Sequence, residues 1–522
     1  MLRILGKLLA FAAIGMASQA QAAWNEVKTR HFIIYANEKP DLLRDFATRL
    51  ELFDQGVRSV RSMTDPALSD SGRVKIYVVS DYDNIDRFLG IANVRGMYIP
   101  RTSGLIAFVP KMSRDKGEIF ELNSQTIFFH EYAHHLQLQN TSAVIPRWLV
   151  EGTAEFFSTA RIEKDGSIRF GSPANHRAST LLSGHNLPFK TMLEDNYSKL
   201  DDEQTDDLYG RGWLLTHYLT FEPARRGQLD AYLKALQTGQ PTLAAAQSAF
   251  GNIDQLERDL DAYVKRRRLT TLVVPPPAAG AGAIAIRQMQ PGEAAIMTVR
   301  ARSDRGVNTK TAPGVAADAR KIAGQYPNDP AVMAALAEAE LDAGQYAAAI
   351  AASSKAIALD PRNNKALIFK ARALKEDAEG RKAKVNWTDI RALLIKANRL
   401  DPDDPEPLMY YYLSYPEAGE NPSRNSVTGL IYAADLVPQV DELRFLATQQ
   451  LLFDKNLPKA LQMYASIAYD PHQSERSREQ ARRVMAAIAA SNAQQALELL
   501  GNDADAEGDG DDSGKLTEPL TH

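Results

Sequence analysis

Residues 125–135 read QTIFFHEYAHH, and this stretch decides how the first half of the chain is interpreted. Its periodicity is helical, and on a helix His130 and His134 leave one face about one turn apart, close enough to bind a single ion. Glu131 projects beside them, where a general base would take a proton from a metal-bound water. The stretch therefore predicts a metal site. The alternative is a helix whose histidines belong to a packed core.

A second predicted helix, residues 146–160, carries the ligand that this site still needs. Catalytic zinc usually has three protein ligands and a water, and Glu151 fills the third place. Sixteen residues lie between His134 and Glu151, enough to end one helix and bring an antiparallel one back against it. Glu155, one turn on, is a candidate acceptor for the free ring N–H of a metal-bound histidine. In the alternative interpretation, Glu151 and Glu155 are exposed charges.

The composition excludes several other kinds of site and partner. The chain has no cysteine, so disulfides, thiolate nucleophiles, iron–sulfur clusters and Cys-ligated zinc are excluded. Its 61 basic and 65 acidic side chains give a net charge of -4, and the last 22 residues alone hold seven acidic residues and one basic residue. A body without excess positive charge does not attract polyanions, so we expect no nucleic-acid binding.

The first 22 residues have the pattern of an export signal. Arg3 and Lys7 precede an apolar run of ten residues, 8–17, and the small residues Ala20 and Ala22 come just before the expected cleavage point. Roughly 20 apolar residues are needed to cross a bilayer, so we predict a cleaved signal peptide and no stable membrane insertion. An uncleaved membrane anchor is the alternative. The mature protein would be secreted across the inner membrane, into a bacterial periplasm.

The pattern from residue 24 to residue 267 changes from strands to helices. Strands are predicted at 31–35 and 74–79 with a helix at 42–63 between them, and the apolar runs 96–100 and 105–109 predict a hairpin. Further helices are predicted at 125–139, 146–160, 207–220, 225–238 and 254–267. Strands followed by helices favour an α+β domain.

The remaining chain divides into a linker, a helical region and a tail. Residues 268–311 are predicted to be a linker, with PPPAAGAG at 275–282 and a short β-like piece at 294–299. Residues 312–501 are almost wholly helical, and the unit 330–361 resembles a tetratricopeptide repeat. That resemblance implies stacked helix pairs whose concave groove binds a protein partner; paired helices without a repeat are the alternative. Residues 502–522 are predicted to form a disordered acidic tail.

The segments HEYAH (130–134) and WLVEGTA (148–154) together resemble the gluzincin metallopeptidases, the class of thermolysin and the aminopeptidase N-like enzymes. The resemblance is greatest to their small bacterial peptidase-MA-like relatives, and it implies a zincin-like domain over residues 24–267. It implies that Glu131 is the catalytic base, that Glu155 supports a ligand, and that one zinc ion is held by His130, His134 and Glu151. The chain lacks the Gly-x-Met-Glu-Asn segment that holds a substrate's free amine, so aminopeptidase activity is not expected.

Attack of water on a carbonyl also requires a donor to the resulting oxyanion. Tyr209 stands 58 residues after Glu151, near the spacing at which gluzincins carry a Tyr or His for this role. We take Tyr209 as the first candidate for this donor, with Arg211 and His217 as second choices. The alternative is that Tyr209 belongs to the packed core.

These patterns lead to a main hypothesis and two competitors. The main one is an exported zinc metallopeptidase that hydrolyses a peptide or protein substrate, which lies along an edge strand near residues 105–109. A non-enzymatic tetratricopeptide scaffold that carries a relic zincin domain is the first competitor. A zinc hydrolase of non-peptide amides or esters is the second.

Overall fold

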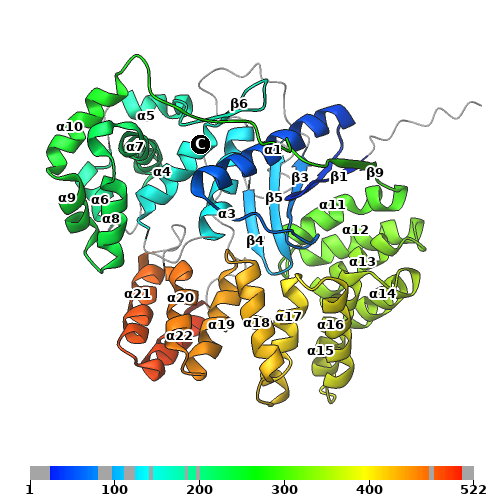
Figure 1. The fold of residues 1–522 in the computed structure, drawn as a ribbon. Coiled ribbons are helices and arrows are strands. Elements are labelled where there is room, and N and C mark those ends of the chain that lie inside the picture. The colour runs from blue at the N-terminus through cyan, green and yellow to red at the C-terminus, as the bar shows by residue number, and fades with distance from the viewer. Residues whose placement is uncertain are drawn as a thin grey trace, which may run out of the picture.

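The computed structural model describes residues 24–79, 97–110, 124–139, 145–182, 186–195, 200–468 and 475–507. A mixed sheet lies near the centre, and the helices from α11 to α22 follow one another in an arc beside and beneath it (Figure 1). The predicted signal peptide, residues 1–22, lies outside the described residues. In the described part of the chain, no helix is both long and apolar enough to span a membrane.

The main sheet has six strands in the order β4-β5-β3-β2-β1-β9. Strands β2, β3 and β5 are parallel, whereas β4 pairs antiparallel with β5, and β1 pairs antiparallel with β2 and β9. The strands are β1 (Asn25–Lys28), β2 (Phe32–Ala36), β3 (Val74–Val79), β4 (Met97–Arg101), β5 (Gly104–Pro110) and β9 (Ala285–Gln288). The two predicted strands and the predicted hairpin are confirmed.

The prediction that residues 105–109 form an edge strand is wrong. Strand β5 lies between β4 and β3, since Ala107 pairs with Tyr98 on one side and with Ile76 on the other. Every residue of β5 is buried, as in a strand with neighbours on both sides. The outer strand is β4, which contains Pro100, a residue confined to edges and bulges because it cannot donate to a neighbouring strand.

Helices cover both faces of the sheet. Helices α1 (Pro40–Arg61) and α3 (Ser124–Gln139) pack on one face, where they meet strand side chains such as Phe32 and Ile76. Helix α11 (Pro291–Arg305) packs on the other face, against Tyr35 and Tyr77 among others. Because side chains alternate along a strand, β2, β3, β4 and β5 contribute to both cores. The helices α1 and α3 match the predicted ranges 42–63 and 125–139.

Residues 268–311 are more ordered than a linker. Strand β8 (Leu272–Val274) pairs with β7 (Ile168–Phe170), which also pairs with β6 (Arg161–Ile162) in a second, three-stranded sheet. The predicted β-like piece at 294–299 is wrong, because these residues lie within helix α11. Met297 faces the sheet, whereas Ile296 faces the helical region. A helix buried on two sides has no single apolar stripe, and this hides its helical period.

The helical prediction for residues 312–501 is confirmed, and successive helices pack against each other. The unit 330–361 corresponds to α13 and α14. The helices are α12 (Ala312–Gln325), α13 (Pro330–Asp342), α14 (Tyr346–Leu359), α15 (Asn364–Gly380), α16 (Trp387–Leu400), α17 (Pro405–Leu413), α18 (Arg424–Leu436), α19 (Asp441–Phe453), α20 (Leu457–Ala468), α21 (Glu475–Ala489) and α22 (Ala493–Glu507). Helix α22 includes the first six residues of the predicted disordered tail, where alanines between the acids favour helix. Residues 508–522 lie outside the described part.

Two further helices frame the region around Glu151. Helix α4 (Arg147–Ser158) packs against α3 and against α7 (Asp202–Phe221). The two helices α4 and α7 match the predicted ranges 146–160 and 207–220. The smaller helices beside them are α5 (Ala178–Leu182), α6 (Phe189–Glu194), α8 (Gln228–Gln237), α9 (Thr242–Phe250) and α10 (Ile253–Val264). Of these, α8 and α10 match the predictions for 225–238 and 254–267, and the other three were not predicted.

Helices α4 and α7 touch backbone to backbone at two glycines. A Cβ atom added to Gly152 would lie 2.3 Å from the carbonyl oxygen of Gly212, and one added to Gly212 would lie 2.6 Å from that of Trp148. No side-chain rotation can relieve such overlaps, because the obstacles are main-chain atoms. Glycine at both positions is therefore what allows the two helices to approach so closely.

We expect Gly152→Ala to lower the free energy of unfolding by about 2 kcal/mol or more, because the added methyl group has to push the two helices apart. The matched control is Gly210→Ala on α7, where the nearest atom to an added Cβ is 3.4 Å away. Alanine is the better helix former by about 0.5–1 kcal/mol, so the control should be neutral or stabilising. Urea denaturation measures the free energy of unfolding of both variants. Equal losses in the two variants would contradict the close contact.

His31 lies in a buried charged cluster that joins β2 to α1. Its Nδ1 is 2.8 Å from Glu51 Oε2 and 3.3 Å from Asp54 Oδ2, and its Nε2 is 2.9 Å from Asp65 Oδ1. The Tyr132 hydroxyl, on α3, donates to Asp54 Oδ1 at 2.8 Å. Burial opposes a charged imidazole, but the hydrogen bond to Glu51 and the charges of Asp54 and Glu51 outweigh it and raise the pKa of His31 above its ordinary value.

A raised pKa of His31 in the folded state means that protonation stabilises the fold. This contribution is complete below the unfolded-state pKa of about 6.5 and is lost as the pH rises through the folded-state pKa. We expect the free energy of unfolding to decrease from pH 6 to pH 9 more steeply in the parent protein than in His31→Gln. Denaturation curves of both proteins across this pH range test the expectation. Parallel pH profiles of the two proteins would rule out a stabilising protonation of His31.

Candidate metal centre

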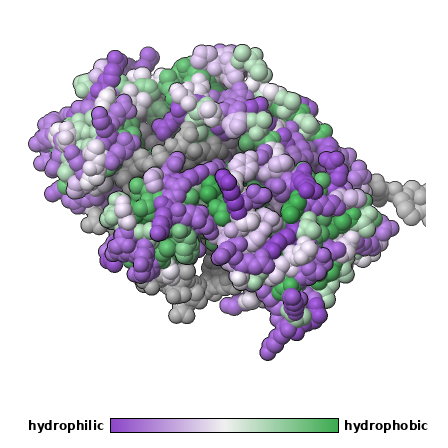
Figure 2. Space-filling model, turned by 60° about the horizontal axis from the view of Figure 1, so that its bottom comes forward, coloured by the Kyte–Doolittle hydropathy of each residue, from purple (hydrophilic) through white to green (hydrophobic). Residues whose placement is uncertain are grey.

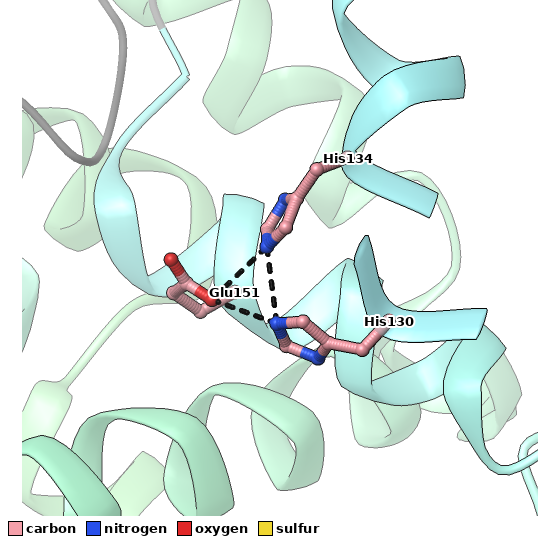
Figure 3. A group of neighbouring side chains, drawn as sticks. All are labelled: His130, His134 and Glu151. Carbon is pink, nitrogen blue, oxygen red and sulfur yellow. Dashed lines mark hydrogen bonds and ion pairs between the residues drawn. The ribbon is translucent and has the colours of Figure 1, made fainter. Parts of the chain in front are cut away.

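The structure brings His130 and His134 of α3 together with Glu151 of α4 (Figure 3). The Nε2 atoms of the two histidines are 3.0 Å apart, and each lies 3.3 Å from Oε2 of Glu151. All three side chains are buried. Atoms at these separations are equidistant from a point roughly 1.9 Å away, close to the Zn–N length of about 2.0–2.1 Å. The predicted ligand set thus has the size of a zinc site.

Aromatic packing fixes the direction in which the two histidines point. On other faces of α3, Phe129 stacks on Phe53 of α1 with 3.8 Å between ring centroids, and Tyr132 lies 4.9 Å from Phe32 of β2. These contacts hold α3 against α1 and the sheet. Since residues four apart share a helix face, His130 and His134 are left to face α4 together.

The second ring nitrogen of each histidine faces a polar acceptor. His134 Nδ1 lies 3.3 Å from Oε1 of Gln137, whose amide nitrogen donates to the Val150 carbonyl of α4 at 3.2 Å. His130 Nδ1 lies 3.9 Å from Oε1 of Glu155, an ion-pair distance rather than a hydrogen bond. A proton on Nδ1 leaves Nε2 free to bind a metal. Both rings are therefore oriented as metal ligands require.

Glu155 is held in place by two residues that the sequence analysis did not identify. Nε2 of His176 lies 2.9 Å from its Oε2, and the Arg177 guanidinium donates to its Oε1 at 2.8 Å and 3.0 Å. Burial alone would raise the pKa of Glu155, but the charges of Arg177 and His176 hold it well below its usual range. Glu155 is thus held as a carboxylate near His130, and its role as acceptor of the ring N–H stays a prediction. The two partners follow a loop, and no spacing in the sequence relates them to α4.

The charge of Glu151 also acts on His134. Burial disfavours a charged imidazole, but the Glu151 carboxylate outweighs this effect and raises the pKa of His134 to about 9. Without a cation, the pair therefore holds a proton at neutral pH. A metal ion that binds here has to displace this proton.

Glu131 is less buried than the three predicted ligands and lies on α3 with the two histidines. Burial raises the pKa of Tyr98 well above its ordinary value, and the charge of Glu131 adds to this rise. The same charge contributes to the raised pKa values of His134 and Tyr209. The Glu131 carboxylate is therefore within electrostatic reach of the edge strand β4, of one ligand and of α7.

Tyr209, on α7, lies beside the predicted ligands. Its ring centroid is 5.6 Å from that of His130, and the Arg177 guanidinium carbon lies 5.0 Å from the Tyr209 ring centre. Burial, followed by the charge of Glu151, raises the pKa of Tyr209 well above its ordinary value. Its hydroxyl group therefore keeps its proton and can act as a donor, as the sequence analysis requires of this residue.

The two second choices for this donor face other parts of the domain. Arg211 donates to the Leu187 carbonyl at 2.8 Å and to Glu257 at 2.5 Å. His217 lies 3.0 Å from the Tyr263 hydroxyl and 3.1 Å from the Gly171 carbonyl, and burial lowers the pKa of His217 to about 4. Arg211 leaves α7 about 200° from Tyr209, so the two cannot share a face. Both second choices pack in the domain interior rather than at the predicted ligands.

His135, next to a predicted ligand, links α3 to the helical region. Its Nδ1 lies 2.8 Å from the Tyr98 hydroxyl of β4 and 3.0 Å from Nε2 of Gln439, which follows α18. The Gln439 amide also donates to the His135 carbonyl at 3.0 Å. Burial lowers the pKa of His135 to about 3, so the ring is neutral. A residue of the helical region thus contacts α3 directly, which the sequence analysis did not foresee.

Comparison with known families and with curated proteins finds no match for this chain. The gluzincin and tetratricopeptide assignments therefore rest on the residues quoted above and on their positions in the fold.

If the three residues bind zinc, Glu151→Gln should lose most of the zinc that copurifies with the parent, because a neutral amide is a poor ligand for this ion. The matched control is Glu203→Gln, which makes the same change at an exposed position on α7. Elemental analysis of the purified, folded proteins measures zinc per chain, expected to be close to one in the parent and the control. Full zinc content in Glu151→Gln would exclude Glu151 as a ligand.

Proposed function

We propose that the protein is an exported zinc metallopeptidase of the gluzincin type. The observation that carries the proposal is the convergence of three buried ligand atoms, from His130, His134 and Glu151, with a less buried carboxylate, Glu131, on the helix of the two histidines. Two imidazoles and one carboxylate form a typical catalytic donor set, which leaves a fourth position for water or substrate. A structural zinc site would instead be closed by four protein ligands.

Each residue around the ligands has a role in this proposal. Zinc, when bound, would polarise the peptide carbonyl and lower the pKa of water from 15.7 toward about 7. Glu131 takes the proton of the attacking water and passes it to the leaving amine. Tyr209 donates a hydrogen bond to the oxyanion that develops on the carbonyl oxygen. Gln137 orients the His134 ring through Nδ1, and the charge of Glu155 favours a proton on Nδ1 of His130.

We propose that a peptide substrate pairs with β4, which replaces residues 105–109 as the edge strand. Strand β4 packs against α3, so a chain laid along it would pass near the predicted ligands. A strand edge with unpaired main-chain groups can pair with an extended peptide. Residues 97–99 of β4 are buried and Pro100 cannot donate such a bond, so the proposed pairing would have to start from the partly exposed end of the strand at Arg101.

The test of the proposal is Glu131→Gln. We expect this variant to keep its zinc and to lose peptide hydrolysis by a factor of about 10²–10⁴, because the general base is gone while the ligands remain. Hydrolysis is measured by mass spectrometry of a mixed peptide library, with Glu203→Gln as the control. Removal of zinc with a chelator should abolish cleavage by the parent, and added zinc should restore it. Undiminished cleavage by Glu131→Gln would refute the assigned role.

The competing proposal is a non-enzymatic scaffold, and the direct contact between Gln439 and α3 favours it. In such a protein the metal-bearing domain would serve as a support for the helical region. A zinc-loaded parent protein that cleaves no peptide would favour this proposal, and cleavage of only model esters or non-peptide amides would favour a hydrolase of another substrate class.

We also propose that the helical region binds a protein partner. The turn between β4 and β5 already contacts it, since Lys365 donates to the Ser103 carbonyl at 3.1 Å and Thr102 donates to Glu442 at 3.1 Å. On the face brought forward in Figure 2, hydrophobic residues form separate groups among hydrophilic ones. A partner that docks on this face would therefore make mainly polar contacts.

A further inference from the structure

The side chain of Arg177 contacts two helices of the candidate site at once. Arg177 ends the short helix η1 (Asn175–Arg177), and its side chain is buried. The guanidinium donates to Glu155 of α4 through Nε and Nη2, and to Asp206 of α7 through Nη1 at 2.5 Å. One buried cation is therefore bonded both to the helix of a predicted ligand and to the helix of the candidate oxyanion donor.

On the α4 side, Arg177 binds the Glu155 oxygen that faces the predicted ligand His130. Oε1 receives both hydrogen bonds from Arg177, at 3.0 Å and 2.8 Å, and lies 3.9 Å from Nδ1 of His130. The other oxygen, Oε2, lies 2.9 Å from Nε2 of His176 and 3.4 Å from the Ser158 hydroxyl. Hydrogen bonds between charged groups are roughly twice as strong as those between neutral groups. Arg177 therefore sets the position of Oε1 relative to His130.

On the α7 side, Arg177 acts on the helical turn that carries Tyr209. Asp206 lies three residues before Tyr209, and residues at this spacing are neighbours on one face of a helix. The guanidinium carbon of Arg177 also lies 5.0 Å from the centre of the Tyr209 ring, within the range of a cation–π contact. The same ring is 5.6 Å from that of His130. Arg177 thus restrains Tyr209 next to the predicted ligand.

We propose that Arg177 is a positioning residue, which holds the predicted ligand His130 and the candidate oxyanion donor Tyr209 in a fixed relation to each other. It acts on His130 through Oε1 of Glu155. It acts on Tyr209 through the ring contact and through the bond to Asp206. This inference rests on the proposed function, and it adds a residue that binds neither the metal nor the substrate.

Arginine is suited to this role by the shape of its side chain. The guanidinium is a planar fork with five N–H donors, so it can bind two carboxylates and lie against an aromatic ring at the same time. The ammonium group of lysine is a compact charge on a flexible stem and lacks this fork. Lysine at position 177 would therefore keep the charge but could not make the whole set of contacts.

The first test measures the zinc affinity of the full-length protein by competition with a chromophoric chelator. We expect Arg177→Met and Glu155→Gln each to bind zinc roughly tenfold more weakly or worse, as is typical when the support of a metal ligand is lost. The double variant should bind zinc about as weakly as Glu155→Gln alone, because two residues that act through one contact are not additive. The control is Arg258→Met, at an exposed position on α10, which should bind zinc as the parent does.

The second test measures hydrolysis of a peptide that the parent cleaves, at saturating zinc. We expect Arg177→Lys to lower kcat roughly tenfold or more, because a small displacement of a group in the site slows the reaction strongly. KM should stay close to that of the parent, since the oxyanion donor acts in the transition state. Asp206→Asn, which weakens only the bond to α7, should lower kcat in the same direction and keep the zinc affinity of the parent.

Three results would overturn the inference. These are parent-like zinc affinity in Arg177→Met, additive losses in the double variant, and unchanged kcat in both Arg177→Lys and Asp206→Asn. Thermal unfolding shows which variants are folded. If Arg177→Met does not fold, the double variant, in which both buried charges are removed, is compared with Glu155→Gln and decides. A parent protein that binds zinc but cleaves no peptide would refute the proposed function, and the zinc affinities alone would then decide the role of Arg177.

Discussion

The backbone contact between α4 and α7 is the constraint on which the candidate metal centre depends. Gly152 follows Glu151 directly, and Gly212 lies one turn after Tyr209, so this single crossing positions a predicted ligand and the candidate oxyanion donor together. Helix α4 is held between α3 and α7, and both neighbours contribute to the site. A larger residue at either glycine would separate these groups without altering any of them. The geometry of the candidate site thus depends on two residues that have no side chain.

The sequence predicted the parts of the site that are local in the chain. The spacing of His130 and His134 is a property of one helix, and Glu151 needed only one turn and an antiparallel return. Gln137 also lies on α3, one turn from His134, and could have been found by the same rule. The same rule could not have found His176, Arg177 or Gln439, because nothing in their spacing relates them to α3 or α4. Their positions follow from the tertiary fold alone.

The same distinction explains the errors in the fold. The hairpin 96–109 was predicted from two apolar runs and a turn, but which strand is outermost depends on β3, far away in sequence. Helix α11 was missed because its apolar residues serve two different cores. In both cases the deciding contact joins segments separated by more than 25 residues, and local periodicity carries no information about it. The predicted linker proved instead to supply an outer strand of the main sheet.

The hydrogen bonds between Gln439 and His135 can form only late in the synthesis of the chain. The two residues are 304 positions apart, and synthesis proceeds from the N-terminus. A nascent chain that has released α3 and α4 already contains all three predicted ligands, yet the amide that contacts the ligand-bearing helix has still to be translated. This contact therefore forms only after Gln439 has been translated, and any truncated product that ends before Gln439 lacks it.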